Sequence, residues 1–185
     1  MGPDQLHWVD REFTGENFRD DDLSRLRTER VVFSNCDFSG ADLAESDHRG
    51  SAFRNCIFRR TTLWHSILRQ CSMLGSSFEQ CRLRPATFEE VDFTLAALGG
   101  NDLRSVDLTG CRLREANLVG TDLREAVLRG VDLTGARTTG TRLDGADLRE
   151  ATADPTLWTT ASLAGARIDV PQALAFAVGH GLRVE

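Results

Sequence analysis

Bulky apolar side chains recur along this chain at a spacing of five residues. From position 13 to position 168, every fifth residue is bulky and apolar, and only four positions depart from the rule: Thr28, His48, Thr138 and Ala153. From Val31 to Ala166, the residue two positions earlier in each unit is small except at Asn101, and this position holds all five cysteines. A period of five covers no single face of an α-helix and alternates faces on a straight strand, so the chain must turn a corner in every unit.

Four corners close a square, which gives twenty residues per coil. When the bulky residues are grouped by their position within this twenty-residue coil, residues of the same type fall in the same column. One column contains only leucine: Leu23, Leu43, Leu63, Leu83, Leu103, Leu123, Leu143 and Leu163. Another begins with four phenylalanines, Phe18, Phe38, Phe58 and Phe78, before it changes to leucine. Stacked, in-register columns are typical of a solenoid. The pattern predicts an all-β fold, a right-handed quadrilateral parallel β-helix of about eight coils with a short C-terminal α-helix.

The pattern divides the chain into three segments. Residues 1–12, with Trp8, are expected to cap the N-terminal end, and residues 13–168 to form the β-helix, because an open stack needs a cap at each end. Residues 169–185 are expected to form a helix for capping and dimerisation. Asp169 is its candidate N-cap, Pro171 lies in its first turn, and Gly179 is a stop signal.

This expected helix carries two apolar stripes, one of which would cover the last coil. The other has nothing left in the chain to pack against, which predicts a two-fold dimer. A monomer whose helix caps the end is the alternative. The candidate dimer residues are Val170, Leu174, Phe176 and Val178.

A few residues depart from the repeat. His48 occupies an inward position, and we expect it to mark an irregular coil. Pro85 lies at a corner, where its missing N–H is tolerable. The run Gly99, Gly100 and Asn101 predicts a local bulge or bend, and neither feature is expected to shift the register. Cys36 and Cys56 lie one coil apart, but their side chains would stack in parallel, so no disulfide is expected.

Composition and charge narrow the classes of function. The 185 residues are 41% hydrophobic, without a signal peptide or an apolar run of membrane-spanning length, so we expect a cytoplasmic protein without membrane attachment. The formal net charge of −6 argues against binding of nucleic acid. The acidic residues outnumber arginines mainly in the first fifty positions.

The repeat units resemble those of pentapeptide-repeat proteins: ADLAE at 41–45, TDLRE at 121–125 and ADLRE at 146–150 are similar to the A(D/N)LXX consensus. The chain is similar over nearly its whole length to the members of this family that confer fluoroquinolone resistance. That resemblance implies binding to DNA gyrase as a mimic of duplex DNA, which inhibits the enzyme and protects it from fluoroquinolones. Either the saddle of the cleaved DNA segment or the cavity of the ATPase subunit is a possible site.

Outward-facing aspartates supply the negative charge that such mimicry needs. They form two columns: Asp22, Asp42, Asp102 and Asp122 in the first, and Asp47, Asp107 and Asp147 in the second. The first column is interrupted by Thr62, Arg82 and Arg142. Arg84, Arg104 and Arg124 lie on the same side, so ion pairs within the chain are an equally good explanation of the pattern. A structural scaffold or adaptor that binds an unrelated protein is the alternative function.

Catalysis is not expected. The repeat continues without an insertion, so no long loop is present to build a pocket, and no phosphate-binding, zinc or nucleophile motif occurs. A carbohydrate-active β-helix enzyme would need inserted loops and a carboxylate cluster in a groove. We therefore expect no cofactor, no metal and no small-molecule substrate, with His7, His48, His65 and His180 in structural or solvent-exposed roles.

Overall fold

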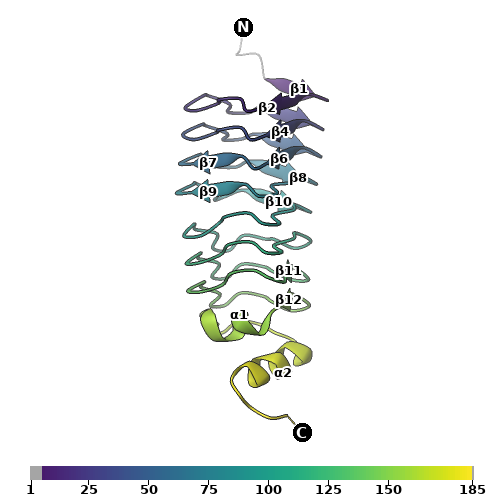
Figure 1. The fold of residues 1–185 in the computed structure, drawn as a ribbon, viewed down its shortest axis with the longest axis vertical. Helices are drawn as coiled ribbons and strands as arrows, with labels where there is room; N and C mark the ends of the chain where they lie inside the picture. Colours follow the sequence, from purple (N-terminus) through teal and green to yellow (C-terminus); the bar gives the residue numbers. More distant parts are fainter. Residues whose placement is uncertain (1–5, 185) are drawn as a thin grey trace.

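The computed structural model describes residues 6–184 and shows a straight stack of square coils, with two helices beneath the last coil (Figure 1). Parallel backbone bridges join positions twenty residues apart on four sides of the stack. We number the sides by their bridged residues: side 1 begins Asp22, Asp42; side 2 His7, Arg27; side 3 Glu12, Val32; and side 4 Asn17, Asp37. The predicted β-helix fold is confirmed.

The strands are short because each side of the square holds only a few residues between corners. The strands are β1 His7–Val9, β2 Glu12–Thr14, β3 Arg27–Glu29, β4 Val32–Ser34, β5 Asp47–Arg49, β6 Ala52–Arg54, β7 Ile57–Arg59, β8 Ile67–Arg69, β9 Ser77–Glu79, β10 Thr87–Glu89, β11 Asp132–Leu133 and β12 Thr152–Ala153. The longest sheet has the order β1-β3-β5-β8-β10 and lies on side 2. Isolated bridges continue the ladders elsewhere.

The interior is a mainly apolar column with a few buried polar side chains. In the N-terminal half it consists of stacked phenylalanine rings: Phe33 and Phe53 have centroids 4.7 Å apart, and Phe58 and Phe78 are 4.9 Å apart with ring planes at 4°. Phe33 and Phe58 are fully buried. The spacing of the rings follows the spacing of neighbouring strands. Leucine replaces phenylalanine in the C-terminal half, as the sorted columns predict.

The corners require left-handed backbone. Glycine adopts it readily, and Gly40, for example, has φ +73°. Many corners nevertheless hold residues with a side chain, such as Glu45 at φ +58° and Asn55 at φ +52°. For such residues the left-handed conformation costs roughly 1–2 kcal/mol each. The backbone ladders on both sides of the corner hold them in this conformation.

The N-terminal end is closed by aromatic packing. Residues 1–5 of the expected cap lie outside the described residues. β1 pairs with β3 in register, and the Trp8 ring lies 4.9 Å from that of Phe13. Trp8 therefore continues the inward column by one residue and covers the first phenylalanine.

The C-terminal end contains a helix that the repeat pattern did not reveal. α1, Pro155–Thr160, replaces one side of the last coil, where we expected a strand and a corner. Its Leu157 and Trp158 are buried, and Ser162 bridges Arg142 in the usual register. The pattern concealed this helix because Trp158 still falls on the five-residue phase.

His48 lies in a regular coil, so the expectation of an irregular one is wrong. It belongs to β5, between Thr28 and Leu68 in register. Its side chain is fully buried, with Nδ1 2.8 Å from the Thr28 hydroxyl and Nε2 2.9 Å from the Ser46 hydroxyl. Burial lowers the pKa of His48 to about 4, so the ring is neutral at physiological pH. The two hydrogen bonds allow a polar ring to occupy an apolar position.

Candidate interaction surfaces

The two aspartate columns lie where the sequence placed them, on sides 1 and 2. Asp22 bridges Asp42, and Asp102 bridges Asp122, so the first column consists of two stacked pairs. Thr62 and Arg82 separate these pairs. The column is therefore discontinuous, and its two halves have different surroundings.

The C-terminal pair is held in ion pairs within the chain. Arg104 Nη2 lies 2.7 Å from Asp102 Oδ2, and Arg84 Nη1 lies 3.0 Å from Asp102 Oδ1. Asp122 is bound in the same way by Arg124 at 2.7 Å. The hydrogen bond from Arg104 lowers the pKa of Asp102, and that from Arg124 lowers the pKa of Asp122. Both carboxylates stay charged, but an adjacent guanidinium offsets the charge.

Two members of the second column are also paired. The Asp147 side chain is only 5% exposed, and its Oδ2 lies 2.6 Å from Arg149 Nη2. That hydrogen bond lowers the pKa of Asp147 to about 2. Asp47 lies 3.2 Å from Arg69 Nη1, and Arg69 also contacts Glu89. For these positions the structure favours the ion-pair explanation.

The remaining three aspartates have no arginine partner within residues 6–184. Each accepts a hydrogen bond from the backbone N–H two residues later: Asp22 from Ser24, Asp42 from Ala44 and Asp107 from Thr109. These bonds orient each carboxylate toward the corner that follows it. Since one bond leaves most of its lone pairs free, all three aspartates can accept hydrogen bonds from a partner.

Unpaired carboxylates gather at the N-terminal end of the stack, and the sequence-based site omitted several of them. Four further exposed acidic residues of the first coils form no ion pair within the described part of the chain: Glu12, Glu16, Asp20 and Asp21. Together with Asp22 and Asp42 they form what we call the acidic tip. The excess of acidic residues in the first fifty positions was the signal that could have identified them.

The C-terminal helix α2, Val170–Gly179, begins as the sequence predicted. The Asp169 side chain accepts a hydrogen bond from the Gln172 N–H at 3.0 Å, and Gln172 Oε1 accepts one from the Asp169 N–H at 3.0 Å, which completes a capping box. The Gln172 amide also donates to Leu148 O and Ala151 O of the last coil. A polar side chain therefore anchors the helix to the stack.

The prediction that one apolar stripe of α2 would cover the last coil is wrong. Val170, Leu174 and Val178 are 74%, 46% and 60% exposed, and Phe176 is 38% exposed. The helix packs instead through Gln172 and Ala175, and its Gly179 lies against Trp158 of α1. All four candidate dimer residues are thus available for contact, together with Leu182 and Val184.

Other chemistry-bearing groups are buried or dispersed. All five cysteines are free thiols, as predicted for Cys36 and Cys56. Burial raises the pKa of Cys56 to about 12 and that of Cys71 to about 11, so these thiols are unreactive near neutral pH. Residues 6–184 contain no group of three or more His, Cys, Asp or Glu side chains arranged to hold a metal ion. In the same region, neither helix has the length and hydropathy needed to cross a bilayer.

Square coils, inward small and bulky residues and left-handed corners define a β-solenoid built from five-residue units. The comparison with known families agrees. A model of pentapeptide repeats matches residues 36–75, 101–137 and 126–156 in 8 copies, just over half of the chain. The protein belongs to the pentapeptide-repeat family.

Two relatives are closely similar over part of their length. The chain is 78% identical over 59 residues to the pentapeptide repeat protein MfpA of Mycobacterium tuberculosis, and 70% identical over 63 residues to MfpA of Mycolicibacterium smegmatis. The matched segments cover 32% and 34% of this chain, and the same segments span 32% and 33% of the two relatives. The matches therefore span about a third of each protein.

Solved structures share the fold at low sequence identity. A trypsin-treated form of QnrB1, described as a plasmid-mediated fluoroquinolone resistance protein, aligns over 99% of this chain and 95% of its own, with a TM-score of 0.67 and 19% identity. HetL of the cyanobacterium Nostoc, involved in regulating heterocyst differentiation, covers 88% of this chain and 85% of its own, with a TM-score of 0.57 and 24% identity. These likenesses establish the fold alone.

Proposed function

We propose that this protein binds DNA gyrase as a mimic of duplex DNA, inhibits the enzyme and thereby protects it from fluoroquinolones. The observation that carries the proposal is the 70–78% identity to MfpA over about a third of the chain. The similarity of the chain to family members that confer fluoroquinolone resistance also supports the proposal. The described residues supply surfaces for binding and no metal-binding cluster, so the proposed activity is binding without catalysis, cofactor or small-molecule substrate.

Shape supports mimicry better than total charge does. Eight coils at ~4.8 Å give a rod of roughly 38 Å, and duplex DNA of that length carries about 22 negative charges. The formal net charge here is −6, and arginines offset the charges of Asp47, Asp102, Asp122 and Asp147. A mimic of this composition must rely on its unpaired carboxylates, and six of these lie close together in the acidic tip.

Two matched double variants test this reasoning in a supercoiling assay. Asp22→Asn with Asp42→Asn removes two unpaired carboxylates, and Asp102→Asn with Asp122→Asn removes two paired ones, so both change the net charge equally. We expect the first to raise the concentration for half-inhibition about tenfold, or ~1.4 kcal/mol, and the second about threefold or less. Equal effects would reject direct contact through the tip. Absence of inhibition by the unmodified protein would reject the proposed function.

The ATPase activity of gyrase in the absence of DNA separates the two possible sites. A rod in the cavity of the ATPase subunit occupies the place of the transported segment and is expected to change basal ATP turnover. A rod on the saddle is expected to compete with DNA and leave basal turnover unchanged. The measurement compares turnover with and without the protein at saturating ATP.

We also propose that the protein acts in the cytoplasm as a homodimer joined through α2. Six apolar side chains of α2 and the following residues are exposed, and a self-complementary helix face is a common basis for two-fold association. Joining two chains at their C-terminal helices would place the two acidic tips at opposite ends of a longer rod.

A structural scaffold or adaptor is the second candidate function. It is favoured by the arginine partners of four of the seven aspartates, since paired charges on a solvated face need no further partner. This function predicts no effect on supercoiling. It also predicts that reversing the charges of Asp42, Asp102 and Asp122 together would leave the protein's activity unchanged.

A further inference from the structure

The ladders of two sides are interrupted at the same step of the stack. On side 1, bridges join Thr62 to Arg82 and Asp102 to Asp122, and within the described residues none joins Arg82 to Asp102. On side 2, β8 pairs with β10 at Thr87, and the ladder resumes only at Asp107. Sides 3 and 4 continue without interruption through the same coils. The backbone ladder is therefore interrupted along two adjacent sides and continuous along the other two. On side 1, side chains replace it: Asn101 Oδ1 accepts the Cys81 N–H at 3.1 Å, and Arg84 binds Asp102.

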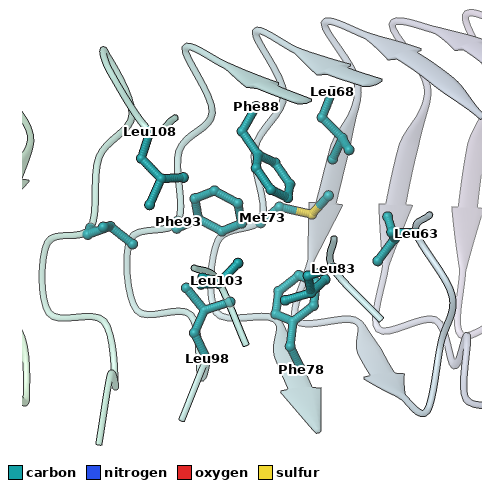
Figure 2. Close-up of a pocket in the computed structure, with 11 residues that line it drawn as sticks. Leu63, Leu68, Met73, Phe78, Leu83, Phe88, Phe93, Leu98, Leu103 and Leu108 are labelled. Atoms are coloured by element: carbon teal, nitrogen blue, oxygen red, sulfur yellow. The ribbon is translucent and has the colours of Figure 1, made fainter. Parts of the chain in front are cut away.

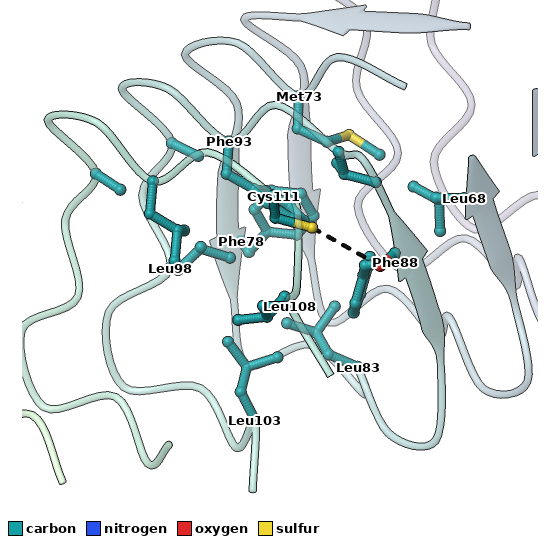
Figure 3. Close-up of a cluster of buried hydrophobic side chains, with 14 of the residues drawn as sticks. Leu68, Met73, Phe78, Leu83, Phe88, Phe93, Leu98, Leu103, Leu108 and Cys111 are labelled. Atoms are coloured by element: carbon teal, nitrogen blue, oxygen red, sulfur yellow. Dashed lines mark hydrogen bonds between the residues drawn. The ribbon is translucent and has the colours of Figure 1, made fainter. Parts of the chain in front are cut away.

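Hydrogen bonds show the same opening. Leu108 N–H donates to Val127 O at 2.8 Å, and Leu128 N–H to Asp147 O at 2.8 Å. The equivalent bond from Phe88 N–H to Asp107 O is not formed within residues 6–184. Cys111 Sγ reaches across this step to Phe88 O at 3.7 Å (Figure 3), the longest of the five thiol bonds to the carbonyl 23 residues earlier.

Pro85 gives a physical reason for the opening. The corner residues directly above and below it in the stack, His65 and Ser105, have φ of +56° and +57°. The proline ring fixes φ near −65°, so Pro85 cannot adopt this conformation. The chain from 84 to 86 leaves the path of the other coils, and the two sides that meet at this corner lose their pairing to the next coil.

Packing is weaker at the same level. The small inward residue of each unit is buried from Leu26 to Ala151, with two exceptions, Cys81 and Ala86, which are half-buried. The core beside them contains a cavity of about 10 Å³ lined only by apolar side chains, among them Met73, Phe93 and Leu98 (Figure 2). A space of this size and polarity stays dry. The cavity lies where the phenylalanine stacks change to leucine.

We propose that this step is a one-sided hinge, about which the rod bends. Residues 6–94 and 101–168 move as two rigid stacks, and the axis is the corner between sides 3 and 4, where Leu95 N–H still donates to Arg114 O at 2.9 Å. Bending widens or closes the gap on sides 1 and 2, where few backbone bonds must break. The inference rests on the geometry of this chain and not on the proposed binding to gyrase.

Pairs of spin labels at equal spacing along one corner test the hinge. Arg49→Cys with Arg129→Cys spans four steps of the stack and crosses the opening. Val9→Cys with Glu89→Cys spans four intact steps and is the matched control. Both pairs are exposed and are expected about 19 Å apart along the backbone. Cys81→Ala in both backgrounds removes the one native thiol that is not buried.

We expect double electron–electron resonance to give a distance distribution about twice as wide for the pair that crosses the opening. Pro85→Glu introduces a residue that adopts the left-handed conformation at this corner in other coils, as Glu45 and Glu125 do. This substitution should narrow that distribution to the width of the control. Equal widths for the two pairs would overturn the hinge, and this comparison stands even if Pro85→Glu does not fold. If the Pro85→Glu variant folds but the distance distribution of the pair that crosses the opening stays equally wide, the hinge is overturned as well.

Discussion

Arg84 Nη1 donates to both carboxylate oxygens of Asp102 at 3.0 Å, and this pair joins two coils that no backbone bridge joins on side 1. Asp102 belongs to the column that the sequence marked as a contact surface for a partner. In the structure it links two parts of its own chain. The same carboxylate can therefore serve stability, and the unpaired aspartates are better candidates for binding.

Removing Arg84 should weaken the stack slightly more than removing an arginine at an intact step. We expect Arg84→Ala to lower the free energy of unfolding by about 1 kcal/mol, since partly exposed pairs contribute little individually. Arg59→Ala, which removes a 3.4 Å pair to Glu79 at a step that backbone bonds also hold, is the control and should cost about 0.5 kcal/mol or less. Urea denaturation of both variants measures the difference, and a larger loss for Arg59→Ala would contradict the assignment.

His48 should make the protein sensitive to mild acid. The pKa of His48 is about 4 in the folded protein, compared with an ordinary value of 6.5. Below pH 6.5 the unfolded chain therefore binds a proton at His48 that the folded protein does not bind. The contribution of neutral His48 to the free energy of unfolding is fully present above pH 6.5 and is lost as the pH falls toward 4. We expect the free energy of unfolding to fall by about 2 kcal/mol between pH 7 and pH 5.

The control for this pH dependence is His48→Gln, which keeps hydrogen-bonding groups near Thr28 and Ser46 but does not titrate. Urea midpoints at pH 7 and pH 5 should differ clearly for the native chain and much less for the variant. If both lose the same stability, another group causes the acid sensitivity.

The cavity beside Leu98 should tolerate a larger side chain. Leu98→Phe extends the phenylalanine column from Phe78 into the empty space, so we expect a change of stability within about 1 kcal/mol. Leu118→Phe makes the same substitution one coil further on, away from the cavity lining, where overpacking should cost about 1–3 kcal/mol. Thermal unfolding distinguishes the two, and an equal cost would show that the cavity does not accommodate the ring.

The exposed face of α2 should control association. We expect Leu174→Asp and Phe176→Asp each to convert a dimer to a monomer in sedimentation equilibrium, because a buried unpaired carboxylate costs several kcal/mol. Thr139→Asp, at an exposed corner of the stack, is the control and should leave the mass unchanged. A Phe176→Asp variant that sediments as a stable dimer would exclude association through this face.

The register of the coils was predictable because it depends on local periodicity. Alternating small and bulky residues can be buried together only if the chain turns every five residues, so Phe33 and Phe53 had to stack. The capping box of α2 was predictable for the same reason, since Asp169 and Gln172 lie within one turn. Such features require only neighbouring residues and the spacing of strands.

Pairing between coils was not contained in the local pattern. The sequence analysis treated Asp22 and Asp102 as equivalent members of one column, although Arg104, two residues after Asp102, was a local sign of an ion pair. The contact of Asp102 with Arg84, from the neighbouring coil, required the structure. His48 looked like a defect until Thr28 and Ser46 were placed beside its ring. Trp158 kept the five-residue phase while its segment formed a helix.

The sequence by itself therefore determined the β-helix, its register and the start of the final helix, because the five-residue period fixes which side chains point inward. The tertiary structure alone decided which charges stay free, which face of α2 is exposed and where the ladders open. The exposed helix face and the open ladders depend on contacts between residues about twenty positions apart. The ion pairs depend on them only in part: Arg104, Arg124 and Arg149 each bind the aspartate two residues earlier. Arg69 and Arg84 reach an aspartate in a neighbouring coil.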